Sequence, residues 1–281
     1  MNIKFLIKTS RPKFWAYTFG TYLVGYFAGL KSADITQLTN PKFILLLIFF
    51  TFFANLFIYG VNDISDRDTD KHNIKKKKHE NLLKKKDEGL LKRSLVFTII
   101  LSVLIMIVIP ETRFWIIMFL ILGGAYSLPP FRLKKRPFLD SISNIFYVFP
   151  AFGGYLLTQD SIPNFHSIVY FLFFPVAMHL YSAIPDIEAD SKAKLKTSAV
   201  VFGPTASLVI CNVLWLIFAL GIINFGVYFP WTLVLLVYPI LPLLNLNMKS
   251  FPVSKTYWYL PLINFVLGFG FSMLIIFNLY E

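Results

Sequence analysis

The sequence predicts an all-α membrane protein, a bundle of nine transmembrane helices that forms one domain over residues 1–281. The first observation is the composition: 56% of the 281 residues are hydrophobic and only 15% are charged. Soluble domains contain about 45–50% apolar and about 25% charged residues. The second observation is a series of long apolar segments, and the third is the distribution of basic residues between them. Together they exclude a soluble domain, a disordered chain and a nucleic-acid-binding protein.

Each predicted span follows from the need for about 20 mostly apolar residues to cross a bilayer. The nine segments that best meet this need are 14–30, 43–61, 94–110, 114–128, 138–157, 167–184, 205–226, 229–246 and 258–279. The fourth segment is short. The eighth contains Pro230, Pro239 and Pro242, which membrane helices tolerate but which we expect to bend it.

The basic residues predict the side of the membrane that each connection faces. Of the 27 Lys and Arg residues, 24 precede the first span or follow an even-numbered span. Connections rich in Lys and Arg stay in the cytoplasm. We therefore expect a multi-pass protein of the cell (cytoplasmic) membrane, with its amino terminus in the cytoplasm, its carboxyl terminus outside and cytoplasmic motif loops at 62–93 and 185–204.

The first acidic cluster directly follows the second predicted span. Seven of the 15 acidic residues lie between Asp63 and Glu88. If the helix continues past the span at about 100° per residue, one of its faces presents an amide and three carboxylates. These side chains belong to Asn62, Asp63, Asp66 and Asp70.

A second acidic cluster follows the sixth span at the same predicted edge, where Asp186 and Asp190 share a helix face at i, i+4. Oxygen ligands suit Mg²⁺, which proteins usually hold through a few carboxylates and substrate phosphates. We therefore expect both clusters to hold Mg²⁺ and, through it, a diphosphate, with Asp66 and Asp186 as the catalytic residues. Basic residues nearby would bind the remaining phosphate oxygens: Arg132, Lys134, Lys194 and Lys196. The alternative for either cluster is solvated loop charge.

These motifs resemble those of the UbiA-type intramembrane prenyltransferases. The family motif N-D-x-x-D-x-x-x-D matches 62–70, and the family motif D-x-x-x-D matches 186–190. The resemblance also covers the nine spans and the run at 196–199 before the seventh span. It implies an enzyme that binds an isoprenyl diphosphate through Mg²⁺ at these aspartates and transfers the prenyl group to a lipophilic acceptor.

Four further segments resemble lycopene elongases, which add dimethylallyl groups to a carotenoid to give C50 products, in some cases with a final hydration. The segments are 10–17, 59–63, 126–134 and 182–186. The alternative is an enzyme of quinone biosynthesis that prenylates hydroxybenzoate or dihydroxynaphthoate. Many of those enzymes carry Y-x-x-x-K after the fourth span, whereas here Tyr126 is followed four residues later by Pro130. The residue that takes the role of the lysine of this motif is therefore either Arg132 or Lys134.

Polar residues within the predicted spans are a further set of candidates. Arg11, Trp15, Thr18 and Tyr22 would share a face of the first span, and Asp140, Asn144, Tyr147 and Ala151 a face of the fifth. Polar side chains inside a membrane usually face the bundle interior and mark a substrate route. The alternative is hydrogen bonding between helices. We expect Arg11, Tyr126 and Asn144 to contact substrate.

Two features and one function class stay open. His179 either lines the acceptor pocket or is a hydrogen-bonded structural histidine. The lysines at 75–78 and 84–86 either cover the diphosphate or lie on anionic headgroups. A cation transporter is the rival class. It predicts acidic residues deep within the spans, whereas the acidic residues here lie mostly in the connections.

Overall fold

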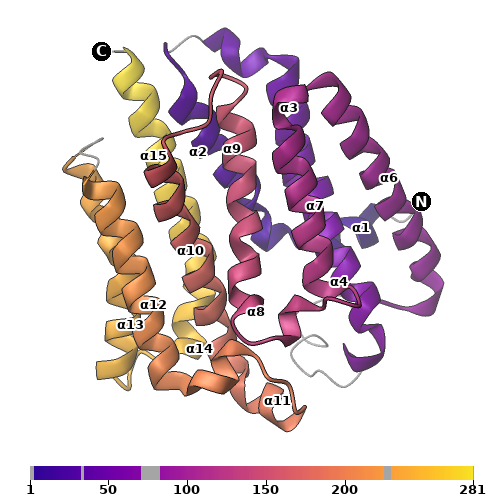
Figure 1. The fold of residues 1–281 in the computed structure, drawn as a ribbon, viewed down its shortest axis with the longest axis vertical. Helices are drawn as coiled ribbons and strands as arrows, with labels where there is room; N and C mark the ends of the chain where they lie inside the picture. Colours follow the sequence, from indigo (N-terminus) through magenta and orange to yellow (C-terminus); the bar gives the residue numbers. More distant parts are fainter. Residues whose placement is uncertain (1–2, 33–34, 71–82, 225–228, 281) are drawn as a thin grey trace.

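Helices run back and forth through the molecule (Figure 1). The computed structural model describes residues 3–32, 35–70, 83–224 and 229–280, and these residues contain no β-strand. The helices of the first half are α1 (Ile3–Thr9), α2 (Phe19–Gly29), α3 (Pro41–Ile48), α4 (Ala54–Asp70), α6 (Lys85–Val108), α7 (Arg113–Ser127), α8 (Leu139–Ile142) and α9 (Phe149–Tyr155). Those of the second half are α10 (Phe165–Ala183), α11 (Ile187–Lys192), α12 (Ser198–Asn224), α13 (Val237–Asn247), α14 (Val253–Thr256) and α15 (Leu260–Tyr280).

Five helical segments in the described part of the chain are long and apolar enough to cross a membrane. They are Pro41–Arg67, Lys85–Val108, Ile168–Lys192, Ser198–Asn224 and Val253–Asn278. The other predicted spans fall on shorter helical pieces, such as α7 of 15 residues in the fourth span and α2 of 11 residues in the first. An all-helical membrane protein is thus confirmed, while the count of nine spans stays a prediction.

The second predicted span is one long helical unit that continues into the first acidic motif. α3 passes through a π-helical turn at Phe49–Phe53 into α4, which ends only at Asp70. The expected continuation of the helix past Asn62 is therefore present. Within the predicted motif connections, residues 62–70 and 85–93 are helical, as are α11 and the start of α12 within 185–204. The cytoplasmic location of these connections stays a prediction.

The first and fifth predicted spans are not continuous α-helices. Pro12–Tyr17 is a 3₁₀ helix preceded by Arg11 in the left-handed region, with φ of 51°. The four polar residues expected on one face of the first span therefore separate: the Thr18 hydroxyl donates to the Phe50 carbonyl, and Tyr22 is fully buried. The fifth span consists of α8, a 3₁₀ helix at Ser143–Val148 and α9.

α2 packs against α9 with almost no side chain between the two backbones. A Cβ added at Gly25 would lie 1.9 Å from the Ala151 carbonyl oxygen, and one at Gly154 would lie 2.4 Å from that of Tyr22. Small residues at such crossings let membrane helices approach closely and gain van der Waals contact. The two glycines thereby hold the first and fifth predicted spans together.

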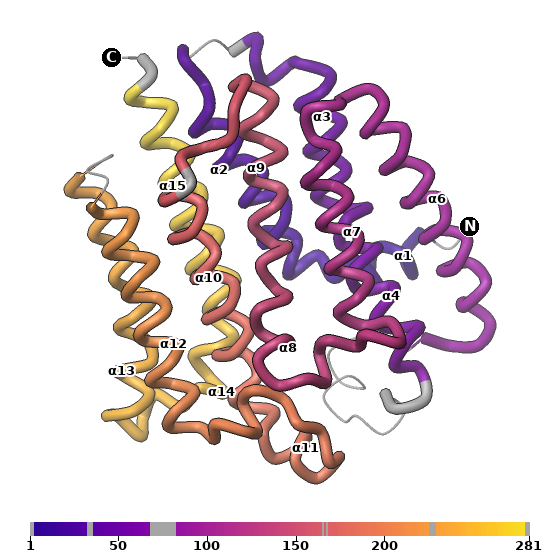
Figure 2. The backbone as a smooth tube through the Cα atoms, in the orientation of Figure 1, coloured from indigo at the N-terminus to yellow at the C-terminus, as the bar shows by residue number. Residues whose placement is uncertain are grey.

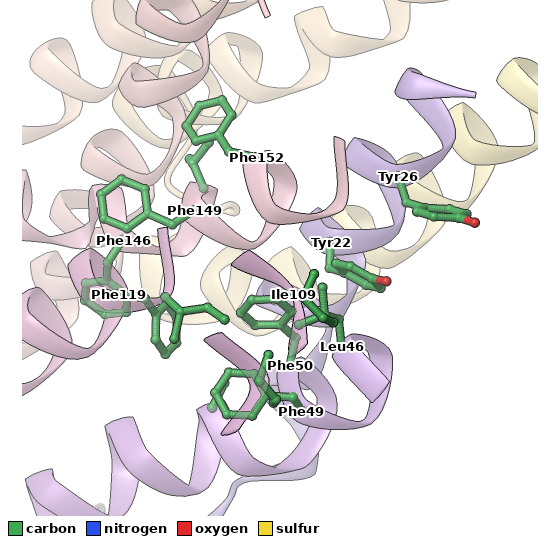
Figure 3. Packing of buried hydrophobic residues seen from close by; sticks show 14 of the residues in the cluster. Tyr22, Tyr26, Leu46, Phe49, Phe50, Ile109, Phe119, Phe146, Phe149 and Phe152 are labelled. Atoms are coloured by element: carbon green, nitrogen blue, oxygen red, sulfur yellow. The ribbon is translucent and has the colours of Figure 1, made fainter. Parts of the chain in front are cut away.

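A chain of aromatic rings connects α2 to the middle of the bundle (Figure 3). The ring centroid of Tyr22 lies 5.5 Å from that of Phe50, Phe50 lies 6.1 Å from Phe119, and Phe119 lies 5.6 Å from Phe146. The Tyr22 hydroxyl donates to the Phe43 carbonyl, so this buried phenol is satisfied. A second buried cluster around Trp215 joins α10, α12 and α13.

The backbone trace places both aspartate motifs at the same end of the molecule (Figure 2). The carboxyl-terminal end of α4 and all of α11 lie at the lower end in this view, whereas the carboxyl-terminal end of α15 lies at the upper end. α10 packs along α12, and α15 packs along α2. The two halves of the chain thus bring their acidic residues to one edge.

Candidate active site

The first motif lies on the last turns of α4, where its Asp63 is paired with a cation. The Arg11 guanidinium donates from Nη2 to Asp63 Oδ1 at 3.0 Å and lies 4.5 Å over the ring of Tyr59. Asp63 is only 6% exposed. Because a buried carboxylate needs a cationic or hydrogen-bonded partner, this pair ties the segment before the first predicted span to the motif.

Asp66, one turn farther along α4, meets the connection between α7 and α8. Lys134 Nζ lies 2.5 Å from Asp66 Oδ2. Asn62 Nδ2 donates to Ser127 Oγ at 3.2 Å, and the Ser65 hydroxyl donates to the Ser127 carbonyl at 2.6 Å. The motif helix is therefore fixed against the end of α7, and its carboxylate lies beside a lysine.

The second motif occupies a change of helix type. Asp186 ends a 3₁₀ helix, Ile184–Asp186, that contains Pro185, and Asp190 lies in the following α11. The proline lacks an N–H and cannot continue the hydrogen-bond pattern of α10, so the helix changes from α to 3₁₀ at this point. The Thr197 hydroxyl donates to Asp190 Oδ2 at 3.3 Å.

A cavity of ≈ 1940 Å³ joins the two motifs. Polar side chains at one part of its lining come from both motifs and the basic connection; they are Arg11, Asn62, Asp66, Lys134, Lys135, Asp186 and Asp190. Much of the remaining wall is aromatic or aliphatic, with Phe27, Phe146, Phe171, Phe174 and Met178 among its residues. The site thus combines a charged end with an apolar body.

Asp140 on α8 makes the hydrogen bonds between helices that were one of the two alternatives for the polar residues of the fifth predicted span. It is fully buried, and its carboxylate accepts from the Ser198 backbone N–H at 2.7 Å, from the Ser198 hydroxyl and from the Ser141 N–H at 2.8 Å. The carboxylate therefore attaches α8 to the start of α12. A carboxylate in an apolar segment could have signalled such a partner, but not which residue it is.

The predicted basic and polar residues divide into two groups. Tyr126, Lys134 and Asn144 line the cavity, together with Arg11. Lys194 and Lys196 are exposed, and the cavity wall at this point consists of Ala193, Leu195 and Thr197 instead. Arg132, with φ of 41°, is also absent from the cavity wall. Of the two basic candidates after the fourth span, the structure brings Lys134 to the motif, and sequence reasoning missed Lys135.

Several expectations fall on residues with no described position. The side chain of Asp70 lies outside the described part of the structure, as do residues 71–82 with the first lysine run. The lysines at 84–86 are exposed at the start of α6. His179 lines the cavity and is hydrogen-bonded on both ring nitrogens, and its contact with an acceptor stays a prediction.

The carboxylates fit a metal that substrate oxygens help to hold. Within the described residues, no three His, Cys, Asp or Glu side chains come close enough together to hold a metal ion by themselves. Asn62, Asp66, Asp186 and Asp190 nevertheless face one cavity. Mg²⁺ typically keeps several waters and takes one or two carboxylates plus phosphate oxygens, so this donor set suits a diphosphate-bridged ion.

A sequence match over most of the chain decides which family it belongs to. Residues 18–259 match the sequence profile of the UbiA prenyltransferase family. This chain belongs to that family. It is therefore a prenyltransferase, and its long apolar helices are those of a multi-pass membrane protein.

The curated relatives point to one branch of the family. The chain is 34% identical over 279 residues to a lycopene elongase/hydratase of Haloarcula japonica, which covers 96% of this chain and 90% of the relative. It is 32% identical to a lycopene elongase/hydratase of Halobacterium salinarum, with 96% of each protein covered. A Corynebacterium glutamicum protein of the same description is 29% identical over 78% of this chain and 76% of its own length.

Solved structures have the same fold. A UbiA homologue from Archaeoglobus fulgidus bound to GPP and Mg²⁺ is similar with a TM-score of 0.71 and 22% identity, covering 96% of this chain and 99% of the other. The same homologue bound to DMAPP and Mg²⁺ gives a TM-score of 0.70 and 20% identity, over 97% and 99% of the two chains. The likeness extends over nearly the whole chain.

Proposed function

We propose that this prenyltransferase moves a dimethylallyl group from its diphosphate to lycopene in C50 carotenoid biosynthesis, with Mg²⁺ as cofactor. The cavity carries this proposal, because its charged end suits a diphosphate and its long apolar body suits a hydrocarbon chain. The lycopene elongase/hydratase relatives, which match over most of their length, support the acceptor.

The two motifs would bind the diphosphate from opposite sides. Asn62, Asp66, Asp186 and Asp190 would hold Mg²⁺, while Lys134 and Lys135 contact the phosphate oxygens directly. Bound Mg²⁺ would supply positive charge to the leaving diphosphate. Departure of the diphosphate leaves an allylic cation. Asp63 would contribute indirectly, because its pair with Arg11 fixes the position of α4.

The apolar wall would then protect the allylic cation from water. Aromatic faces attract cations, and Tyr59, Tyr147 and Phe174 all line the cavity. A closed, water-poor site favours attack by the double bond of the acceptor over attack by water. The lining thus suits both the hydrocarbon acceptor and the intermediate.

We further propose the nine-span topology in the cell membrane, with the motifs and the amino terminus in the cytoplasm and the carboxyl terminus outside. The segregation of 24 of the 27 basic residues supports this orientation. The location of both motifs at the end opposite the carboxyl terminus of α15 agrees with it (Figure 2). Cysteine labelling of the cytoplasmic and outer ends in intact cells would test it.

The acceptor is tested by expressing the chain in a host that accumulates lycopene. We expect lycopene to be converted to larger carotenoids by addition of five-carbon units, and we expect no conversion with an Asp186→Asn variant. Unchanged lycopene together with prenylation of hydroxybenzoate or dihydroxynaphthoate would instead assign the chain to quinone biosynthesis. Mg²⁺ flux through liposomes without any prenyl transfer would support a transporter.

A further inference from the structure

Three side chains form a hydrogen-bonded chain in the cavity wall, outside the aspartate motifs. The Tyr126 hydroxyl lies 2.9 Å from His179 Nε2, and the Ser141 hydroxyl lies 3.1 Å from His179 Nδ1. The three residues come from α7, α10 and α8 respectively. Either ring tautomer can make both contacts, because each hydroxyl can donate or accept. In the tautomer whose Nε2 is free to take up a proton, Tyr126 donates to Nε2 and Nδ1–H donates to Ser141.

The hydrogen-bonded series runs from the cavity wall to a buried serine. Tyr126 and His179 both line the cavity that holds Asp66 and Asp186, whereas Ser141 is buried. The backbone N–H of Ser141 donates to Asp140, which is fully buried. The Asp140 carboxylate therefore lies next to Ser141, and Asp140 also lines the cavity.

The prenylation reaction needs a proton acceptor at its last step. When a carbon–carbon double bond attacks the allylic cation, the positive charge moves onto the acceptor. That charge disappears only when the acceptor loses a proton to form a new double bond, or when water adds and then loses a proton. An aromatic acceptor also loses one proton, so every version of the reaction releases one.

We propose that Tyr126 and His179 take up this proton. The acceptor C–H bond, or the O–H bond of the attacking water, breaks and leaves its electron pair behind. The proton passes to Tyr126 Oη while the phenolic proton passes to His179 Nε2, and the resulting imidazolium is stabilised by Ser141 and by the nearby Asp140 carboxylate. This inference depends on the proposed prenyl transfer, but it holds for either class of acceptor.

A purely structural role for His179 gives different expectations. An interhelical hydrogen bond stabilises a membrane bundle by about 1 kcal/mol, and its loss affects folding and substrate binding together. A proton acceptor affects the chemical step, and general acid–base groups typically contribute at least about 100-fold to it. The two roles are therefore separable by kcat, KM and thermal stability.

His179→Gln is the decisive variant, because the amide of glutamine can donate and accept hydrogen bonds but cannot take up a proton. We expect it to lower kcat by at least about 100-fold and to leave KM for both substrates within about threefold of wild type. Tyr126→Phe should behave in the same way. His166→Gln is the matched control, because His166 is exposed on the same helix and outside the cavity wall; it should retain wild-type turnover.

The double variant Tyr126→Phe/His179→Gln distinguishes one relay from two independent contacts. Residues that act as a unit are strongly non-additive, so the double variant should lose no more activity than the worse single variant. Multiplied losses, wild-type turnover in His179→Gln, or a rise in KM that accompanies a loss of thermal stability would each overturn the relay. A wild-type protein that prenylates only an aromatic acceptor would defeat the proposed lycopene acceptor alone, and the relay would then be measured on that aromatic acceptor.

Discussion

Lys134 Nζ lies 2.5 Å from Asp66 Oδ2, although the two residues are 68 positions apart in the chain. Both side chains are largely buried in the same cavity wall, with exposed fractions of 10% and 16%. The lysine therefore balances the charge of the motif carboxylate and lies where the leaving diphosphate would gather negative charge.

Lys134→Met should lower turnover by about 100-fold, because it removes a cation from the leaving group while it keeps the aliphatic stem. Lys192→Met is the matched control, since this lysine is exposed and pairs with the exposed Glu188; it should retain nearly full activity. The rate of diphosphate release measures the turnover of each variant. Equal rates in the two variants would contradict a role for Lys134 at the diphosphate.

Asp66→Asn and Asp186→Asn should each abolish measurable turnover while the protein remains folded in detergent. The reason is that an amide is a weaker Mg²⁺ ligand than a carboxylate. Glu188→Gln is the control, because this side chain lies two residues from Asp186 but is 82% exposed. Activity assays with a Mg²⁺ titration should show a loss only in the two aspartate variants, and full activity in both would refute the proposed metal ligands.

Arg11→Ala should destabilise the protein by about 3 kcal/mol, because it leaves the buried Asp63 carboxylate without its guanidinium partner. Lys42→Ala provides the comparison, since it breaks an equally short ion pair with Glu111 whose side chains are 45% and 30% exposed. Exposed pairs contribute less than about 1 kcal/mol. Thermal unfolding in detergent measures the loss of stability in each variant. Equal losses would contradict the idea that burial makes the Arg11–Asp63 pair the more important of the two.

Gly25→Ala should destabilise the contact of α2 with α9 by about 2 kcal/mol, because the added methyl group meets the Ala151 backbone. Gly20→Ala lies on the same helix and meets nothing within 4 Å. The thermal midpoint should therefore fall in the first variant and stay unchanged or rise in the second, since alanine favours helix. A fall of the same size in both would mean that helix packing is not the cause.

Removal of divalent metal with EDTA should stop turnover without unfolding the protein. The carboxylates proposed to hold Mg²⁺, Asp66 and Asp186 among them, face the cavity, so we expect the ion to be held together with substrate phosphates rather than to support the fold. Added Mg²⁺ should restore activity. Circular dichroism and the thermal midpoint should stay close to those of the untreated protein, and a large fall in the midpoint would instead indicate a structural metal.

The local features of the first motif were predictable from the sequence. The helical continuation that places Asn62, Asp63 and Asp66 at the end of α4 needed only the periodicity of the helix. The motif residues do not all act alike, however. Asp63 pairs with Arg11 and Asp66 with Lys134, and these partners come from segments whose positions no local pattern specifies.

Backbone irregularities were the main source of error. The expected shared face of Arg11, Trp15 and Thr18 assumed an α-helix, but the chain turns at the left-handed Arg11 and continues as a 3₁₀ helix. Proline at position 12 removes one backbone donor and fixes its own φ. Its presence could have signalled the break, whereas the partners of the displaced side chains depend on packing.

The sequence by itself determined the class of the protein, the side preferred by its basic residues and the two aspartate motifs, because hydropathy and helical periodicity are properties of short segments. Only the tertiary structure decided which cations meet which carboxylates, that Asp140 attaches α8 to α12, and that Tyr126, His179 and Ser141 form one hydrogen-bonded chain. Those relationships join residues from separate helices, and their geometry follows from the packing of α8 against α10 and α12. Local sequence patterns carry no information about such contacts.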